Sequence, residues 1–365
     1  MNLLIQFLRR PAIVHKWGVE DWNRFMPLAR NARLLGRCLY LLEQHDLLGV
    51  VPSRLVDQLR GALNQTRYVQ VQALRELRHV VRVLDREDIP PLVLKGVAYL
   101  VSGLPPSRWR NLSDIDLLVP KDDIVRAEQA LGRDGWQPSG DFDAYDQHYY
   151  RDWMHEVPPL VHRQRAIEVD LHHNLAPPVS RIQINAAKLW ADSLLVSGPY
   201  GMVVRTLAPA DMLLHNAIHL FMNDELRGGL RDVVDFRDLF EHFLAQDAAF
   251  EQLLLGRARA LGCGRPLYYA VSTARDLLGL APSAAFLAEV EVFAPAAPQA
   301  RLMRWLIEQV MAPARLGLRR TAAANQLLFV RSHWVRMPPG MLFRHLVHKM
   351  VKAKKPALSA ADLPG

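Results

Sequence analysis

Apolar residues recur at the spacing of an amphipathic helix over much of the first ninety residues. Apolar positions between 59 and 84 follow a period close to that of a helix, with polar residues in the gaps. The pattern predicts one long helix that begins at Pro52-Ser53 and an earlier helix over about 28–44. Proline cannot continue a helix, so Ile89-Pro90-Pro91 ends the long one. We therefore expect residues 1–87 to form a helical region that serves packing.

Short apolar runs replace the helical pattern after this region. Runs at 92–94, 114–119 and 166–171 predict buried strands, and the amphipathic stretch 122–135 predicts a helix between the second and the third. Strands that alternate with helices indicate an α/β layout. We expect residues 88–205 to form the core of the protein.

Helical spacing returns in the second half of the chain. It starts at Pro209, so we expect residues 206–280 to form a second helical region. Residues 281–300 are rich in Ala and Pro, which predicts a loop or linker at the start of a last region, 281–365, whose tail is basic and helical. The end of this tail is a candidate for peripheral contact with an anionic surface. Its cationic residues are Arg344, His345, His348, Lys349, Lys352, Lys354 and Lys355.

The composition is that of an ordinary soluble protein. Half of the 365 residues are apolar and 22% are charged, which excludes a disordered chain, a fibre and a disulfide-stapled miniprotein. The net charge of +8 suits an anionic partner such as a nucleotide, a nucleic acid or a membrane surface. Cys38 and Cys263 stand alone, so we expect no thiolate zinc site and a reducing, cytoplasmic environment. No apolar run reaches the length of about 18 residues that a membrane span needs, and we expect no transmembrane segment.

Two pairs of acidic residues lie at alternate positions of predicted strands. Asp114 and Asp116 form the first pair, and Glu168 and Asp170 form the second. Residues i and i+2 of a strand point to the same face, so each pair projects two neighbouring carboxylates. Such carboxylates repel each other unless a cation lies between them, and oxygen ligands favour Mg²⁺ or Mn²⁺. Asp170 on an adjacent strand would complete the metal site, with Glu168 as the next candidate.

Cationic and small residues precede the first acidic pair. Lys95-Gly96 follows the first strand directly, and a glycine lets backbone amides approach a phosphate closely. Arg110 lies four residues before Asp114 and can neutralise a phosphate oxygen. Together with the acids, these residues are the parts that a two-metal site needs to align an attacking oxygen with a polyphosphate leaving group.

These motifs, in this order, resemble one known family. L-K-G at 94–96, R-x-x-S-D-I-D-L-L-V at 110–119 and D-L-H at 170–172 resemble the uncharacterised nucleotidyltransferase family of bacteria, a branch of the DNA polymerase β-like nucleotidyltransferase superfamily. The helical part of that family is similar to L-x-P-x-D-x-L-L-H-x-x-x-H at 207–219, followed by L-R-D-x-x-D at 230–235. The resemblance covers about residues 90 to 240.

The resemblance implies an α+β fold, in which a mixed-sheet nucleotidyltransferase core lies between N-terminal and C-terminal helical regions. It also implies transfer of a nucleoside monophosphate from an NTP, such as ATP, to an acceptor hydroxyl or phosphate, with release of pyrophosphate (class EC 2.7.7). A small molecule, a protein side chain and a tRNA end are all compatible acceptors. Mg²⁺ or Mn²⁺ is the implied cofactor, in a two-metal mechanism.

The resemblance also implies roles for single residues. Asp114 and Asp116 would hold both metal ions, and Asp170 would hold the catalytic ion or act as a base toward the attacking hydroxyl. The residues implied to bind the nucleotide phosphates are Lys95, Gly96, Arg110 and Ser113. The wider superfamily has Gly-Ser or Gly-Gly where this chain has Lys95-Gly96, and the chain here matches the narrower family.

Histidines near these motifs have open roles. His172 either hydrogen-bonds to the backbone at its strand end or supports the metal site. His215 and His219 lie one helical turn apart and, with Asp235, could bind the metal of a phosphohydrolase. The plainer interpretation, which we extend to His155, is that these histidines line the cleft or pack between helices.

Two alternatives to a transferase remain at this point. A non-catalytic module that binds a nucleotide or a partner would tolerate the loss of a carboxylate, and none is lost here. A phosphohydrolase would instead depend on a metal held by His215, His219 and Asp235. If the protein is a transferase, we expect residues 206–280 to close over the nucleotide, because transfer requires an aligned acceptor and exclusion of water.

Overall fold

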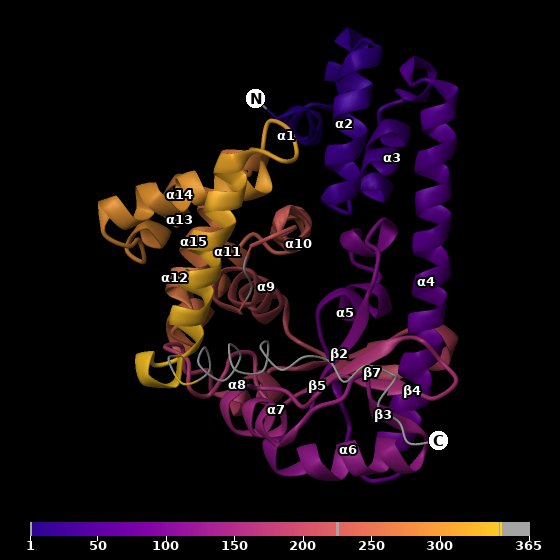
Figure 1. Cartoon of the computed structure of the whole chain (residues 1–365), viewed down its shortest axis with the longest axis vertical. Helices are drawn as coiled ribbons and strands as arrows, with labels where there is room; N and C mark the ends of the chain where they lie inside the picture. The colour runs from indigo at the N-terminus through magenta and orange to yellow at the C-terminus, as the bar shows by residue number, and fades with distance from the viewer. Residues whose placement is uncertain (1, 224–225, 343, 345–365) are drawn as a thin grey trace, which may run out of the picture.

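The computed structural model describes residues 2–223, 226–342 and 344. A mixed β-sheet lies at one end of the molecule, and helices from both halves of the chain extend away from it (Figure 1). This architecture confirms the predicted α+β class with helices on both sides of a mixed-sheet core. In the part of the chain that the structure describes, no helix is both long enough and apolar enough to cross a membrane.

Seven strands within the described residues form one sheet, in the order β3-β4-β5-β2-β1-β7-β6. Their bounds are β1 (Leu92–Val93), β2 (Asp114–Leu118), β3 (Trp136–Pro138), β4 (Leu160–His162), β5 (Glu168–His172), β6 (Leu194–Ser197) and β7 (Val203–Thr206). The pairs β2/β5 and β1/β7 are parallel, and the other neighbours are antiparallel. The three strands predicted from the sequence, β1, β2 and β5, lie side by side at the centre.

Apolar side chains on alternate positions hold these central strands in the core. Ile115 and Leu117 of β2 and Val169 and Leu171 of β5 are fully buried. Four short helices connect the strands, and α6 packs against β5 and against the long helix of the N-terminal region. These connecting helices are α5 (Lys95–Val101), α6 (Ile124–Arg133), α7 (Ala144–His148) and α8 (Ala186–Ala191). The acidic positions therefore project from the opposite face of β2 and β5.

The N-terminal region differs from its prediction at one point. Its helices are α1 (Leu3–Arg9), α2 (Val19–Asn31), α3 (Leu35–Gln44) and α4 (Ser53–Asp85). The long helix begins at Ser53 as predicted. The single helix expected over 28–44 is wrong, because the chain breaks between α2 and α3. Arg33 adopts a left-handed conformation there, with φ of 56°, and the amide of Leu34 bonds back to the carbonyl of Ala29.

The C-terminal half is helical on both sides of the predicted linker, as expected, and also within that linker. Its elements are α9 (Pro209–Ile218), a π-helical turn η7 (His219–Asn223), α10 (Leu230–Gln246), α11 (Phe250–Ala260), α12 (Gly264–Thr273), a second π-turn η8 (Ala274–Leu278), α13 (Ala284–Glu291), α14 (Ala297–Met311) and α15 (Arg319–Arg336). The linker expected over 281–300 is wrong, since alanine favours helix and the prolines stand at or before helix starts. Ser283 caps α13 by accepting from the amide of Phe286. The basic tail from 345 onward lies outside the described residues.

Gly36 offers a test of how tightly the helical region meets the core. A Cβ at this position of α3 would lie 2.7 Å from the carbonyl oxygen of Trp109, a backbone atom that cannot move aside easily. We expect Gly36→Ala to lower the free energy of unfolding by about 1–3 kcal/mol. Gly61→Ala is the matched control, because Gly61 is exposed in α4 and has no atom within 4 Å of the added Cβ. It should stabilise the protein by about 0.5–1 kcal/mol, and equal effects in thermal or urea unfolding would contradict the packing described here.

Candidate active site

The register of the central strands brings the two predicted acidic pairs together. Because β2 and β5 are parallel, Asp114 lies opposite Glu168 and Asp116 lies opposite Asp170. On both strands the acids alternate with buried apolar residues. All of these carboxylates therefore belong to one face of the sheet.

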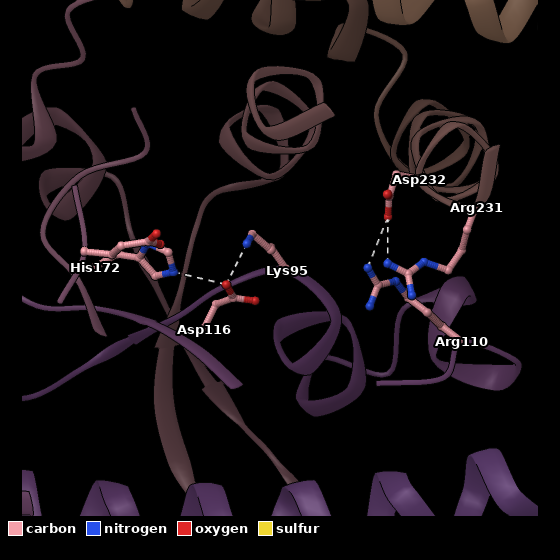
Figure 2. A network of polar contacts seen from close by, with 7 residues as sticks. Lys95, Arg110, Asp116, His172, Arg231 and Asp232 are labelled. Atoms are coloured by element: carbon pink, nitrogen blue, oxygen red, sulfur yellow. Dashed lines mark hydrogen bonds and ion pairs between the residues drawn. The ribbon is translucent and has the colours of Figure 1, made fainter. Parts of the chain in front are cut away.

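Lys95 pairs with one member of this group. It follows β1 closely and begins α5, where its backbone is left-handed with φ of 47°. Its Nζ donates to Oδ1 of Asp116 at 2.6 Å, and Nε2 of His172 lies 3.1 Å from the same oxygen (Figure 2). Asp116 is only 3% exposed, so this cluster is largely shielded from bulk water.

Burial and neighbouring charges set the ionisation of the pair. Burial alone would raise the pKa of Asp116, but Lys95 and His172 outweigh it and hold that pKa well below its usual range. Burial would likewise lower the pKa of Lys95, yet the charges of Asp116 and Asp114 raise it to about 12. At neutral pH the contact is thus a salt bridge between two charged groups.

Asp170 is the carboxylate that this pairing leaves unsatisfied. Burial, and then repulsion from Asp116, raises the pKa of Asp170 to about 8. Its Oδ1 is buried and has no hydrogen-bond partner among the described atoms. Ligand atoms of Asp116, Asp170 and His172 all lie within 4.8 Å of one another. This donor set fits a divalent cation, which would bind the unpartnered oxygen and remove the repulsion.

Asp114 lies beside this group on the same strand face. Burial, and then Asp116, raises the pKa of Asp114, whereas Lys95 and a side-chain hydrogen bond with Ser113 oppose the shift. In the described structure, Asp114 is not a member of the close set formed by Asp116, Asp170 and His172. It is a neighbour of the candidate cation position rather than part of its tightest cluster.

Glu156 joins the site although the sequence analysis did not select it. It forms an isolated β-bridge with His172, and its Oε2 lies 3.3 Å from Nδ1 of that histidine. The ring of His155 lies beside the His172 ring, with centroids 5.2 Å apart. Ligand atoms of these three residues also lie within 4.8 Å of one another. The only hint in the sequence was that Glu156 adjoins His155, which was already a candidate.

A second buried network surrounds Arg110 on the segment before β2. Its Nε donates to Oδ2 of Asp235 at 2.6 Å. One terminal nitrogen donates to Oδ1 of Asp232 at 3.3 Å, and Arg231 donates to the same oxygen (Figure 2). Burial is the main cause that raises the pKa of Asp235 to about 6, although Arg110 opposes it. The guanidinium expected near a triphosphate is therefore engaged by two carboxylates of α10.

Gly96 has a packing reason of its own. A Cβ at this position would lie 2.1 Å from Nη1 of Arg110 and 2.5 Å from a methyl carbon of Leu112. The close approach that we expected between a phosphate and the backbone at Gly96 is, in this structure, an approach of the Arg110 side chain. Only glycine leaves room for that guanidinium to reach α10.

His215 and His219, in α9 and the π-turn that follows it, lie within electrostatic reach of the carboxylate cluster. Both are held neutral at pH 7, because burial and then the charge of Lys95 lower the pKa of each imidazole. Asp235, which the sequence analysis grouped with them, bonds to Arg110 instead. Among the described residues, the groups able to hold a metal contain neither of these two histidines.

Carboxylates beside a lysine on one face of a mixed sheet suit chemistry on phosphate esters. Residues 19–279, more than two thirds of the chain, match the model of a family described as uncharacterised nucleotidyltransferase. The chain belongs to this family, and nucleotidyl transfer is the general role that the membership supports. A search of curated proteins finds no match.

Because the pKa of Asp170 is raised, the free energy of unfolding should depend on pH in the absence of metal. A carboxyl group whose folded-state pKa lies above its unfolded value of about 3.9 loses its contribution to stability as pH rises toward the folded pKa. Asp170→Asn does not titrate and keeps the shape. In a chelating buffer, we expect the variant to melt several degrees above the wild type at pH 9 and the difference to shrink as pH falls to 5. A difference that is constant with pH would show that Asp170 is not the strained carboxylate.

Arg110 predicts a large structural effect. Its removal leaves Asp232 and Asp235 buried near each other, and the loss of one partner of a buried pair costs about 3–5 kcal/mol. We expect Arg110→Ala to lower the free energy of unfolding by that amount in urea titrations. Arg108→Ala, on the same segment, removes an exposed hydrogen bond to Tyr40 and should cost about 1 kcal/mol or less. Similar losses in the two variants would argue against the buried clamp.

Proposed function

We propose that the protein is a metal-dependent nucleotidyltransferase, which moves a nucleoside monophosphate from ATP or another NTP to an acceptor and releases pyrophosphate (class EC 2.7.7). We further propose that it belongs to the DNA polymerase β-like superfamily. The main support is the cluster in which Asp116 and Asp170 lie opposite each other on parallel strands. Asp116 pairs with Lys95, and Oδ1 of Asp170 is buried and has no described hydrogen-bond partner. Family membership agrees with this assignment.

Asp114, Asp116 and Asp170 are the residues proposed to hold Mg²⁺ or Mn²⁺. The bound ions would neutralise the phosphate charges that build up during transfer. His172 orients Asp116 through its 3.1 Å contact, and Glu156 holds the other ring nitrogen of His172. Glu168, opposite Asp114, lies next to the site in the sheet.

The reaction that these residues would serve is an in-line displacement. The acceptor oxygen forms a bond to the α-phosphorus, and the bond from that phosphorus to the oxygen bridging to the β-phosphate breaks. Pyrophosphate leaves with the bonding electron pair. Asp170 is proposed either to hold the catalytic ion or to accept the proton of the acceptor hydroxyl. Its pKa of about 8 keeps the carboxyl protonated at neutral pH, so the role of base requires nearby cations that lower this pKa.

Lys95 is the residue proposed to bind the triphosphate directly, because its Nζ already lies in the cluster and carries a full charge. Gly96, which follows Lys95, and Ser113, which precedes Asp114, are also proposed to bind the phosphates. Arg110 acts mainly by positioning, since Asp232 and Asp235 engage its guanidinium. His155, His215 and His219 are proposed to line the cleft that the helical region closes.

The two alternatives have less support. A phosphohydrolase on His215 and His219 lacks its acid, because Asp235 bonds to Arg110. A non-catalytic module gives no reason for three acids and a lysine on one buried face. We propose a cytoplasmic location, consistent with the free, buried thiols of Cys38 and Cys263.

Asp116→Asn tests the proposed function. Incubation of the full chain with each α-labelled NTP, Mg²⁺ and cell extract should transfer label to one component of the extract. Loss of the carboxylate that faces both Lys95 and Asp170 should reduce labelling by at least about 100-fold, while circular dichroism shows a folded chain. Asp122→Asn removes an exposed carboxylate near β2 and should label like the wild type. Retained labelling in the Asp116 variant would refute the assignment.

A further inference from the structure

A large polar cavity lies next to the Arg110 network. Its volume is about 830 Å³, and three distant segments of the chain form its walls. These are the turn between α2 and α3, the start of α10 with the preceding π-turn, and the connection from α14 into α15. A chamber of this size lies in the range of small-molecule binding sites.

Positive charge dominates the cavity wall. Arg33, Arg227, Arg231 and Arg319 line it, and Asp232 is the one acidic residue among its described lining. Asp232 is already shared between Arg231 and Arg110. Within the described residues, no carboxylate pairs with the other three arginines. Nε of Arg231 is also buried without a described partner, so the cavity holds more cationic donors than acceptors.

The start of α15 adds backbone donors to the same cavity. The first turn of α15 lines it, and this helix of 18 residues has neither a side-chain cap nor an acidic residue in its first turn. The start of α10 also lines the cavity, but Asp232 stands in the first turn of that helix. Free amide groups at the start of a helix attract anions, and those of α15 lie beside the arginines.

His219 and Asp232 connect the cavity with the candidate active site. Both residues line the cavity. The pKa of His219 falls to about 3 through burial and then the charge of Lys95, so the imidazole lies within electrostatic reach of the carboxylate cluster. Asp232 bonds to Arg110, whose Nη1 lies against Gly96 at the start of α5. A ligand in the cavity would therefore lie beside the reaction centre rather than in it.

We propose that this cavity is the acceptor site, and that the acceptor is a small molecule carrying a phosphomonoester. The proposal rests on the proposed nucleotidyl transfer, for which it names the second substrate. A doubly charged phosphate matches several arginines that pair with no described carboxylate, together with the start of α15, better than a single carboxylate does. A pocket bounded by three segments of the chain also suits a small molecule, whereas a nucleic acid requires a basic groove along its backbone.

The position of the cavity in the chain agrees with a role in acceptor choice. The α14–α15 wall lies beyond residue 279, where the match to the family ends, while the acids and Lys95 lie within the match. The walls with Arg33, Arg227 and Arg231 lie within the match, so the shared part would hold much of the acceptor site, and α14 and α15 would complete it.

Binding of inorganic phosphate to the full chain in a chelating buffer tests the anion site directly. Calorimetry should show that Arg319→Ala weakens phosphate binding about tenfold or more, as the loss of one charge-assisted contact implies. Arg320→Ala is the matched control, because it removes the same charge from the same turn of α15 but does not line the cavity. It should change binding less than twofold, and thermal melts of both variants should match the wild type. Equal effects of the two substitutions would overturn the proposal.

Asp116→Asn separates the cavity from the reaction centre. The variant should bind phosphate as the wild type does, because Asp116 does not line the cavity. Altered phosphate binding in this variant, in which Lys95 has lost its charged partner, would place the anion at the carboxylate cluster and overturn the proposal.

Labelling identifies the acceptor class. With α-labelled NTP and Mg²⁺, the small-molecule fraction of a cell extract should yield a labelled product, and prior phosphatase treatment of that fraction should abolish it. Arg319→Ala should raise the KM for this fraction and leave the KM for NTP unchanged. A second outcome is that the wild type labels RNA or protein, or that its labelling survives phosphatase treatment, while Asp116→Asn labels nothing. In that case the transferase assignment stands and the acceptor proposal fails. If Asp116→Asn still labels, the transferase assignment itself fails.

Discussion

Repulsion between buried carboxylates is the constraint on which this structure depends. The parallel register of β2 and β5 is needed to bury Ile115, Leu117, Val169 and Leu171, and the same register sets Asp116 against Asp170. Lys95 offsets the charge of Asp116. The change from β1 to α5 occurs at this lysine and places its side chain beside that carboxylate. Asp170 has no such partner, and its pKa rises to about 8. A bound cation would stabilise its charged form and remove the repulsion from Asp116.

Arg110 connects the segment before the acidic strands to the C-terminal helices. Its contacts to Asp232 and Asp235 span more than a hundred residues of sequence and tie the segment before β2 to α10. The start of α10 also forms part of the arginine-lined cavity. One guanidinium therefore fixes the distance between the strands that hold the acids and the helices that form the cavity wall. Gly96 is part of the same contact, since any side chain there would displace Arg110.

Local patterns predicted the centre of the fold and missed its margins. Strands β1, β2 and β5 are apolar runs bounded by polar residues, and α4 has a long helical period, so burial alone identifies them. The edge strand β6 is largely exposed and has no such pattern. The Ala- and Pro-rich stretch at 281–300 is helical because its prolines stand at or before helix starts. In the site, alternation placed the acidic pairs on one face. The partners of Arg110 and the contact of Glu156 with His172 arise from tertiary packing that spacing does not encode.

Lys95 adopts a left-handed backbone conformation that its side chain strains. Its φ of 47° lies where glycine rests without strain and where a side chain costs roughly 1 kcal/mol. The charge of its side chain, however, is what holds Asp116 ionised beside Asp170. A glycine at this position would relieve that strain but leave Asp116 buried without its cation, and the loss of one partner of a buried pair costs about 3–5 kcal/mol. The strained backbone at Lys95 therefore persists because the salt bridge of its side chain stabilises the protein by more than the strain costs.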